Sequence, residues 1–162
     1  MRFSLIDRIT SLEAGKSVTA VKNLSLAEEY LSDHFPGFPV MPGVLMLESL
    51  VQAGAWLMRY TEDFQYSTIL LKQARAVRFN TFVKPGQTLS LNATVRERGT
   101  SSWDLKGTGT VEGASAVSAR LTLEQFNPHS GEKQVAKPDQ IRSECMRELF
   151  SQLWKPPGGR TS

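Results

Sequence analysis

One segment, residues 43–60, limits the possible folds more than any other part of this 162-residue chain. Pro42 and Gly43 mark the start of a helix, and apolar residues then occur on nearly every side of it. Such a helix must be buried all round. Glu48 and Gln52 interrupt the apolar run, which falls short of the ~20 residues that a membrane span needs. We therefore predict a helix enclosed by a globular domain.

The residues after this helix change to a period of two, which is typical of strands with one wet face. Residues 68–83 predict two strands or one bent strand, and further strands are expected at 89–95, 103–111 and 116–126. Ahead of the helix, we expect short strands at 3–9 and 17–24 and a helical turn at 26–32. This order predicts an α+β fold in which an antiparallel sheet wraps the helix. Because one small sheet leaves part of such a helix uncovered, we also expect a dimer that extends the sheet.

The composition shifts after residue 126, which divides the chain into a domain at 1–126 and an extension at 127–162. Ile141, Cys145, Leu149 and Leu153 recur at helical spacing and predict an amphipathic helix at about 139–154. We expect this helix to pack on the domain or on a partner, without a part in catalysis. The residues that follow, 155–162, are expected to be disordered.

The composition is that of an ordinary soluble single domain, with 40% hydrophobic and 22% charged residues. Cys145 is the one cysteine, which excludes an intrachain disulfide and a metal site of several cysteines. The N-terminal residues reach Asp7 too soon for the apolar core of a signal peptide. We therefore expect a cytoplasmic protein that does not enter a membrane.

Six basic residues and a single acid, Glu97, lie between positions 72 and 98. The basic residues are Lys72, Arg75, Arg78, Lys84, Arg96 and Arg98. They fit two interpretations: a surface that steers an acidic partner, or the charged outer faces and protected edges of strands. Aromatic residues do not alternate with these charges as they do on a nucleic-acid platform, so a nucleic-acid partner is not expected.

The chemically most informative segment is the loop that leads from His34 into the helix as far as Glu48. Histidine suits a general base because its unperturbed pKa lies nearest neutrality. A carboxylate on an apolar helix has its charged form disfavoured, so it suits an acid. Gln52 lies one helical turn beyond Glu48 and can hydrogen-bond to it. Gly43 begins the helix, and its free N–H can stabilise a developing oxyanion.

This segment also has a purely structural interpretation, in which Glu48 and Gln52 form a satisfied polar pair in an interface and His34 caps a loop. The combination favours a site, because the proline and glycine residues between His34 and Glu48 fix the backbone path, as pre-organised chemistry requires. They are Pro36, Gly37, Pro39, Pro42 and Gly43.

The run His34-Phe-Pro-Gly-x-Pro-Val-Met-Pro-Gly-Val-Leu-x-x-Glu48-x-x-x-Gln52 closely resembles the signature of the β-hydroxyacyl–acyl carrier protein dehydratases of bacterial fatty-acid synthesis, the FabZ type. The resemblance continues at residues 5–9, 21–24, 74–79 and 83–86, and covers about 3–125. It implies the hotdog fold, a long helix wrapped by an antiparallel sheet, in agreement with the pattern above.

The resemblance also implies the roles of individual residues. His34 matches the histidine that removes the C2 proton of a 3-hydroxyacyl thioester, and Glu48 the acid that protonates the leaving C3 hydroxyl. Gly43 matches the glycine whose amide binds the thioester oxygen. In this family the site is shared, with His34 of one subunit facing Glu48 of the other, so a homodimer or a trimer of dimers is implied. The implied partner is acyl carrier protein bearing a 3-hydroxyacyl-phosphopantetheine, which the basic segment could dock. No metal or cofactor is implied.

The chain departs from the family pattern in places. It lacks the N-terminal helix and the Pro-His-Arg lead-in, residues 70–74 differ from the usual run, and Gln87 stands where an acid commonly follows Pro-Gly. The tail from residue 127 is additional. Two alternatives to the dehydratase therefore stay open. One is a specialised paralogue for polyketide, unusual-lipid or CoA thioesters, and the other is a non-catalytic module that binds acyl thioesters.

Overall fold

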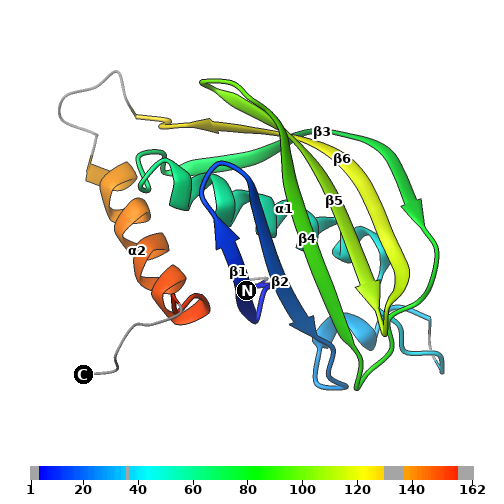
Figure 1. The fold of residues 1–162 in the computed structure, drawn as a ribbon. Coiled ribbons are helices and arrows are strands. Elements are labelled where there is room, and N and C mark those ends of the chain that lie inside the picture. Colours follow the sequence, from blue (N-terminus) through cyan, green and yellow to red (C-terminus); the bar gives the residue numbers. More distant parts are fainter. Residues whose placement is uncertain (1–3, 36, 130–136, 157–162) are drawn as a thin grey trace.

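The strands form one antiparallel six-stranded sheet in the order β1-β2-β4-β5-β6-β3, shown in Figure 1. The computed structural model describes residues 4–35, 37–129 and 137–156. The elements are β1 (Arg8–Glu13), β2 (Ser17–Asn23), the 3₁₀ turn η1 (Glu29–Leu31), α1 (Gly43–Thr61), β3 (Thr68–Phe79), β4 (Thr88–Arg98), β5 (Ser102–Val111), β6 (Ala114–Phe126) and α2 (Lys137–Leu153). The strands β1 and β3 are the two edges of the sheet.

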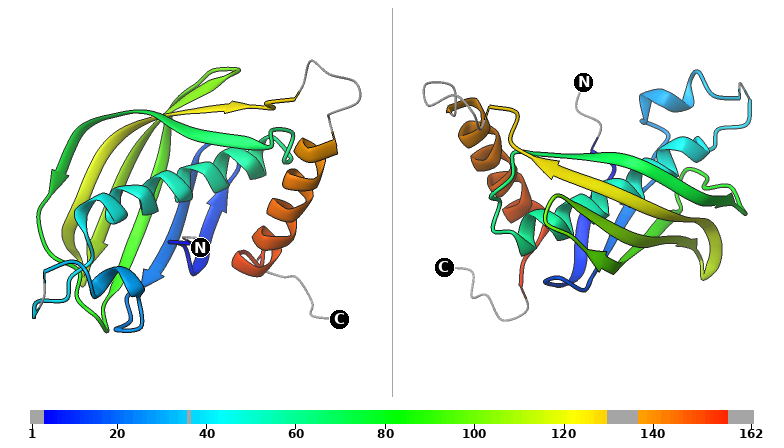
Figure 2. Two further views of the ribbon diagram at one scale, coloured as in Figure 1. Left: turned by 180° about the vertical axis from the view of Figure 1, so that it is seen from behind. Right: turned by 90° about the horizontal axis from the view of Figure 1, so that it is seen from above.

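Helix α1 lies across one face of the curved sheet, as the view from behind in Figure 2 shows. Its central residues Leu50, Leu57 and Met58 are completely buried against the sheet. Gly54 allows this close approach, because a Cβ there would lie 2.6 Å from a methyl carbon of Leu105. The prediction of an enclosed helix is confirmed, and none of the helices in the described ranges is long and apolar enough to cross a membrane.

The longest edge strand, β3, bends around the helix. Its register against β6 shifts between Leu71 and Gln73 and again between Arg75 and Arg78, and Ala76 has a positive φ of 50°. Such bulges increase local twist and bend a strand. Of the two alternatives for residues 68–83, the structure contains the single bent strand, which ends at Phe79.

The predicted α+β hotdog fold is confirmed, and the remaining predicted strands and the C-terminal helix occur within a few residues of their predicted bounds. The first strand is a correction, because β1 runs from Arg8 to Glu13 and not over residues 3–9. Leu5 and Ile6 are adjacent and both buried, which an alternating strand does not permit at a sheet with one wet face. Of the end predicted to be disordered, residues 157–162 lie outside the described residues. The domain boundary at 126 stays a prediction.

Helix α2 packs on the C-terminal end of α1, beside the start of β3 (Figure 1). Phe150 is its anchor: its ring contacts the rings of Trp56, Tyr60 and Phe64 at centroid distances of 5.4–5.8 Å. Arg147 pairs with the Asp63 carboxylate at 2.8 Å. The C-terminal helix therefore packs on its own domain, which was one of its two predicted locations.

Candidate active site

The loop that carries His34 is held in an unusual backbone conformation. Phe35 has a positive φ of 51°, which is rare for an aromatic residue, and Gly37 follows with a φ of 84°. The Phe38 N–H closes this turn by donating to the Phe35 carbonyl at 2.9 Å. Non-glycine residues in this region of φ are strained and concentrate at functional sites. The strained backbone therefore indicates that this loop belongs to a functional site and does not only connect two elements.

A second segment, residues 80–83, holds the His34 loop from the side. The Met41 N–H donates to the Val83 carbonyl at 2.9 Å, and the ring of Phe38 meets that of Phe82 edge-on at 5.6 Å. Together the two segments enclose a mostly apolar cavity of about 730 Å³, which we call the first cavity. Its lining includes His34, Met41, Gly43, Phe79 and Phe82.

Gly43 lies at the first position of α1 and faces this first cavity. The first N–H groups of a helix have no partner within the helix and carry partial positive charge, so they can bind an oxygen that gains negative charge. A Cβ at position 43 would lie 3.1–3.3 Å from three ring carbons of Phe79. Glycine is therefore the residue that lets the backbone and the Phe79 ring share the wall of the cavity.

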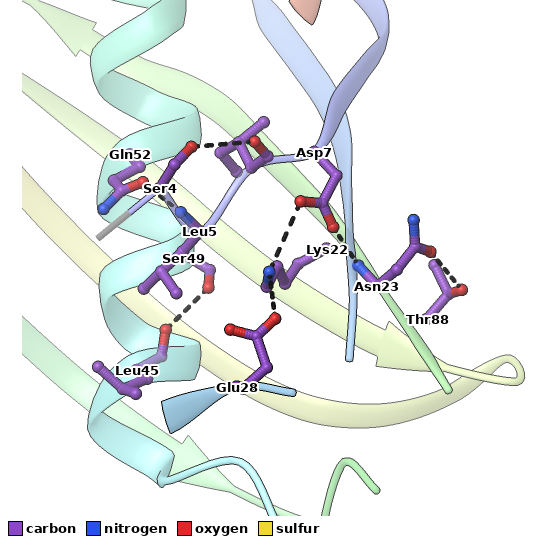
Figure 3. A network of polar contacts seen from close by, with 11 residues as sticks. Ser4, Leu5, Asp7, Lys22, Asn23, Glu28, Leu45, Ser49, Gln52 and Thr88 are labelled. Carbon is purple, nitrogen blue, oxygen red and sulfur yellow. Dashed lines mark hydrogen bonds and ion pairs between the residues drawn. The ribbon is translucent and has the colours of Figure 1, made fainter. Parts of the chain in front are cut away.

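Glu48 is oriented by a chain of two hydrogen bonds. The Gln52 amide donates from Nε2 to Oε1 of Glu48 at 3.1 Å, which is the bond that their spacing predicts. The Oε1 of Gln52 in turn accepts from the Leu5 N–H at 2.9 Å, drawn in Figure 3. A donor from the main chain thus fixes the amide orientation of Gln52, and with it the position of the Glu48 carboxyl.

The N-terminal segment that supplies this donor is itself held by a nearly buried charge. Lys22 is 5% exposed, and its ammonium lies 2.7 Å from the Glu28 carboxylate and 3.5 Å from that of Asp7. Asp7 also accepts from the Asn23 N–H at 2.6 Å (Figure 3). These contacts tie the segment before β1 to β2 and to the start of η1, and so keep Leu5 in place beside Gln52.

Glu48 and His34 of one chain line different cavities. The second cavity, of about 420 Å³, is lined by Glu48 and Gln52, by further residues of α1 including Arg59, by Ile69 of β3, and by Met146 and Leu149 of α2. His34 and Gly43 belong to the first cavity and Glu48 to the second. The predicted acid and base therefore do not share one cavity within a protomer.

The structure keeps three of the six basic residues together, since Arg96 lines one hollow with Arg75 and another with Arg78. Arg78 and Arg96 line one hollow on the face of the sheet opposite α1, with Lys106 and Arg120. Arg75 lies 3.9 Å from Asp104 and Lys72 lies 4.0 Å from Glu124. Arg98 pairs with Glu62 at 2.8 Å. Lys84 instead lies over the Phe38 ring at 5.6 Å, beside the first cavity.

Several residues of the two cavities are absent from the sequence-based prediction. Phe79 and Phe82 come from the end of β3 and the segment after it, and the long-range fold that brings them to His34 leaves no local signal. Arg59 has such a signal, because Glu48, Gln52, Ala55 and Arg59 follow the i, i+4, i+7, i+11 spacing of one helix face. A cation on that stripe of an otherwise apolar helix could have been noticed.

The fold agrees with what comparison with known proteins shows. A family model described as a FabA-like domain matches residues 1–120, about three quarters of the chain. The chain belongs to this FabA-like family.

Within the family, similarity is high to proteins named 3-hydroxyacyl-(acyl-carrier-protein) dehydratase FabZ. The chain is 40% identical over 122 residues to that of Thiobacillus denitrificans, covering 74% of this chain and 84% of the relative. It is 40% identical over 118 residues to that of Levilactobacillus brevis, covering 73% and 80%. Among solved structures, the dehydratase heterocomplex ApeI:P of Xenorhabdus doucetiae has the same fold, with a TM-score of 0.66, 18% identity and coverage of 82% and 89%.

Proposed function

We propose that this chain is a 3-hydroxyacyl–acyl carrier protein dehydratase, which converts a 3-hydroxyacyl thioester and releases a trans-2-enoyl thioester and water. The observation that carries the proposal is the first cavity, in which His34 and the N-terminus of α1 at Gly43 face one apolar space. The identity to the FabZ dehydratases supports it over most of the chain. The composition, with one cysteine, fits a cytoplasmic location.

The chemistry follows from three groups. The His34 imidazole takes the proton from C2, and the electron pair of that C–H bond forms the C2–C3 double bond. The C3–O bond breaks, and the hydroxyl leaves as water with a proton from Glu48. The Gly43 N–H donates to the thioester oxygen while negative charge builds on it. Transfer of a proton from His34 to Glu48 through solvent restores both groups.

A complete site then requires two copies of the chain. His34 and Glu48 of one protomer line separate cavities, so the base of one copy would meet the acid of the other. The edge strand β3 supports such pairing, since Leu70, Leu71 and Phe79 on it are exposed. A long edge strand with exposed apolar side chains readily pairs with another chain. We therefore propose a homodimer that forms along β3, and a trimer of dimers stays a prediction.

The direct test is conversion of 3-hydroxyacyl–acyl carrier protein to the 2-enoyl product, followed by ultraviolet absorbance and mass spectrometry. We expect His34→Ala and Glu48→Gln each to lower turnover by about 10²- to 10⁴-fold. Asp33→Asn is the matched control, because Asp33 is an exposed neighbour of His34. Tight binding of the acyl carrier without turnover in the wild type would instead identify a non-catalytic acyl-binding module.

For the carrier protein, Lys84 is the basic residue placed closest to the chemistry. It lies over Phe38, whose ring contacts Phe82 in the wall of the first cavity. The phosphopantetheine arm has to enter this cavity, so an acidic carrier that docks beside Lys84 delivers it directly. Lys84→Glu should raise KM for the carrier-linked substrate about tenfold, and leave a substrate on free pantetheine unaffected. A higher KM in Arg96→Glu but not in Lys84→Glu would place the carrier on the opposite face of the sheet.

A further inference from the structure

Arg59 stands out among the arginines of the described residues. It is half-buried on α1, and its Nε is completely buried without a hydrogen-bond partner in the described part of the chain. Its guanidinium lies over the Trp56 ring at 5.3 Å. Burial lowers the pKa of Arg59 to about 10, so the side chain still carries its charge at neutral pH.

Two other arginines show which partners a guanidinium over an aromatic ring has elsewhere in this protein. Arg98 lies over the Trp103 ring and Arg147 over the Phe64 ring, at 4.9 and 4.7 Å. Each of them also pairs with a carboxylate at 2.8 Å. Arg59 has the aromatic contact, but no ion pair is formed with it in the described ranges 4–35, 37–129 and 137–156. A charge withdrawn from water is costly unless an acceptor or an opposite charge meets it.

Arg59 lines the second cavity, as Glu48 does. Eleven residues separate them on α1, so they lie about 16 Å apart along the axis, at 1.5 Å per residue. Between them the lining is mainly apolar, with Val51, Ala55 and Trp56 on α1 and Ile69 on β3. The cavity is therefore an apolar passage between a carboxyl group and a cation.

Helix α2 closes the passage at the cationic end. Met146 and Leu149 of α2 line the cavity, and Phe150 fixes the helix to Trp56. Asp139 anchors its first turn, since it accepts from the Ser67 hydroxyl at 2.7 Å and from the His129 N–H at 2.9 Å. Helix α2 and His129 lie beyond the family match at 1–120.

We propose that the second cavity holds the distal part of the acyl chain and that Arg59 binds a carboxylate at its far end, so that the preferred substrates are 3-hydroxyacyl thioesters with an ω-carboxylate. This inference rests on the proposed dehydratase function. A carboxylate matches the guanidinium in charge and in its two parallel donors. An ω-methyl group in the same place would leave the buried Nε without an acceptor.

The geometry limits the length of such a substrate. An extended chain advances about 1.2 Å per bond, as the three backbone bonds of an extended residue do over about 3.6 Å. The 16 Å between Glu48 and Arg59 therefore corresponds to roughly 13 bonds at most from C3 to the carboxylate. The Arg59 side chain extends into the cavity and shortens this limit, so medium-length chains fit best.

The test compares two 3-hydroxyacyl thioesters of equal length on the same carrier, one ending in a methyl group and one in a carboxylate, over a series of lengths. We expect wild-type kcat/KM to favour the carboxylate. Arg59→Leu should lower kcat/KM for the carboxylate substrate about 10- to 100-fold and leave the methyl substrate unchanged or faster. Arg59→Lys should retain part of the preference. Arg8→Leu, which removes an exposed arginine, should not alter the ratio.

Two results would overturn the inference and leave the dehydratase function intact. One is the same ratio of kcat/KM in wild type and Arg59→Leu. The other is an equal loss on both substrates with a weaker dimer, which would identify a carboxylate of the second copy as the partner of Arg59. If neither substrate is converted, the proposed function fails, and calorimetry then decides on Arg59 separately. Saturated ω-carboxyacyl pantetheine should bind wild type at least tenfold more tightly than Arg59→Leu.

Discussion

The two ends of α1 are built in opposite ways. At the N-terminal end, Gly43 opens into the first cavity, and Phe35, Phe38, Val44 and Phe82 around it remain exposed. At the C-terminal end, α2 covers the helix, and Trp56 and Phe64 are buried against Phe150. The open end lies within the family match at 1–120, whereas the helix that closes the other end lies beyond it.

This difference distinguishes the residues proposed to carry out the reaction from those proposed to select the substrate. In the proposed mechanism, His34 and Gly43 lie at the end that remains open in a single protomer, and the proposed dimer would supply Glu48 of the second copy there. The groups that would define the substrate, Arg59 and the α2 residues beside it, lie at the end that the protomer completes by itself. Substitutions at the first end should therefore change the rate, and those at the second end the stability or the choice of substrate.

Mixing subunits tests most directly whether the acid and the base of one site come from different protomers. His34→Ala and Glu48→Gln chains should each be almost inactive, with losses of about 10²- to 10⁴-fold. After co-refolding or co-expression, half of the dimers are mixed, and each mixed dimer has one intact site of two. We therefore expect recovery of about one quarter of wild-type activity, because a two-fold dimer places both substitutions at the same site.

The control for subunit mixing is the double variant His34→Ala/Glu48→Gln mixed with wild-type chain. In those mixed dimers each site lacks one group, so activity should come from wild-type dimers alone. Failure of the single variants to complement each other, in a dimer confirmed by native mass spectrometry, would place the acid and the base in one protomer.

A smaller but still large effect is expected at Gly43. Gly43→Val places carbon atoms against the Phe79 ring, where even a Cβ would lie 3.1–3.3 Å from it. The displaced backbone would lose its donor to the thioester oxygen, and we expect kcat to fall about 10²-fold, as for other lost oxyanion donors. The neighbouring exposed residue provides the control, since Val44→Ala should leave kcat nearly unchanged. Normal kcat in Gly43→Val would show that the Gly43 amide does not bind the oxygen.

How far the sequence could predict these two ends also differs. Nineteen consecutive residues contain the His34-to-Glu48 motif, the start of α1 at Gly43 and the contact of Gln52 with Glu48. Local sequence patterns are therefore sufficient to predict these features. The other walls of the cavities, such as Phe79 and Met146, arrive through long-range packing that no local pattern records. Long-range packing also explains the correction to the first strand. Leu5 and Ile6 are apolar because they are buried in the core, not because they pair in a strand.

At the closed end, Phe150→Ala should lower stability rather than the reaction rate. Phe150 is 8% exposed and contacts three aromatic rings, so truncation leaves a cavity between α2 and α1. We expect a loss of about 3 kcal/mol in the free energy of unfolding, measured by denaturant titration. Ile141→Ala on the same helix is the control, since Ile141 is 52% exposed and should cost less than about 0.5 kcal/mol. Equal effects of the two substitutions would mean that α2 is not docked in solution.

The smallest effect is a dependence of α2 docking on acid. Burial raises the pKa of Asp139, but the hydrogen bonds from Ser67 and His129 outweigh it and hold the pKa below its ordinary value of 3.8. Because the folded pKa is the lower one, the carboxylate stabilises the fold fully above the ordinary value. This contribution fades as the pH falls through the folded pKa. The groups that face this carboxylate are His129, whose Nδ1 lies 3.3 Å from Oδ1, and Arg142, which donates to the adjacent Thr68 hydroxyl at 3.1 Å. Asp139→Asn should lower the melting temperature near pH 6 and lose part of the decline toward pH 2, whereas Glu112→Gln at the exposed β5–β6 turn should follow the wild type. Parallel pH curves for wild type and Asp139→Asn would show that Asp139 does not anchor the helix.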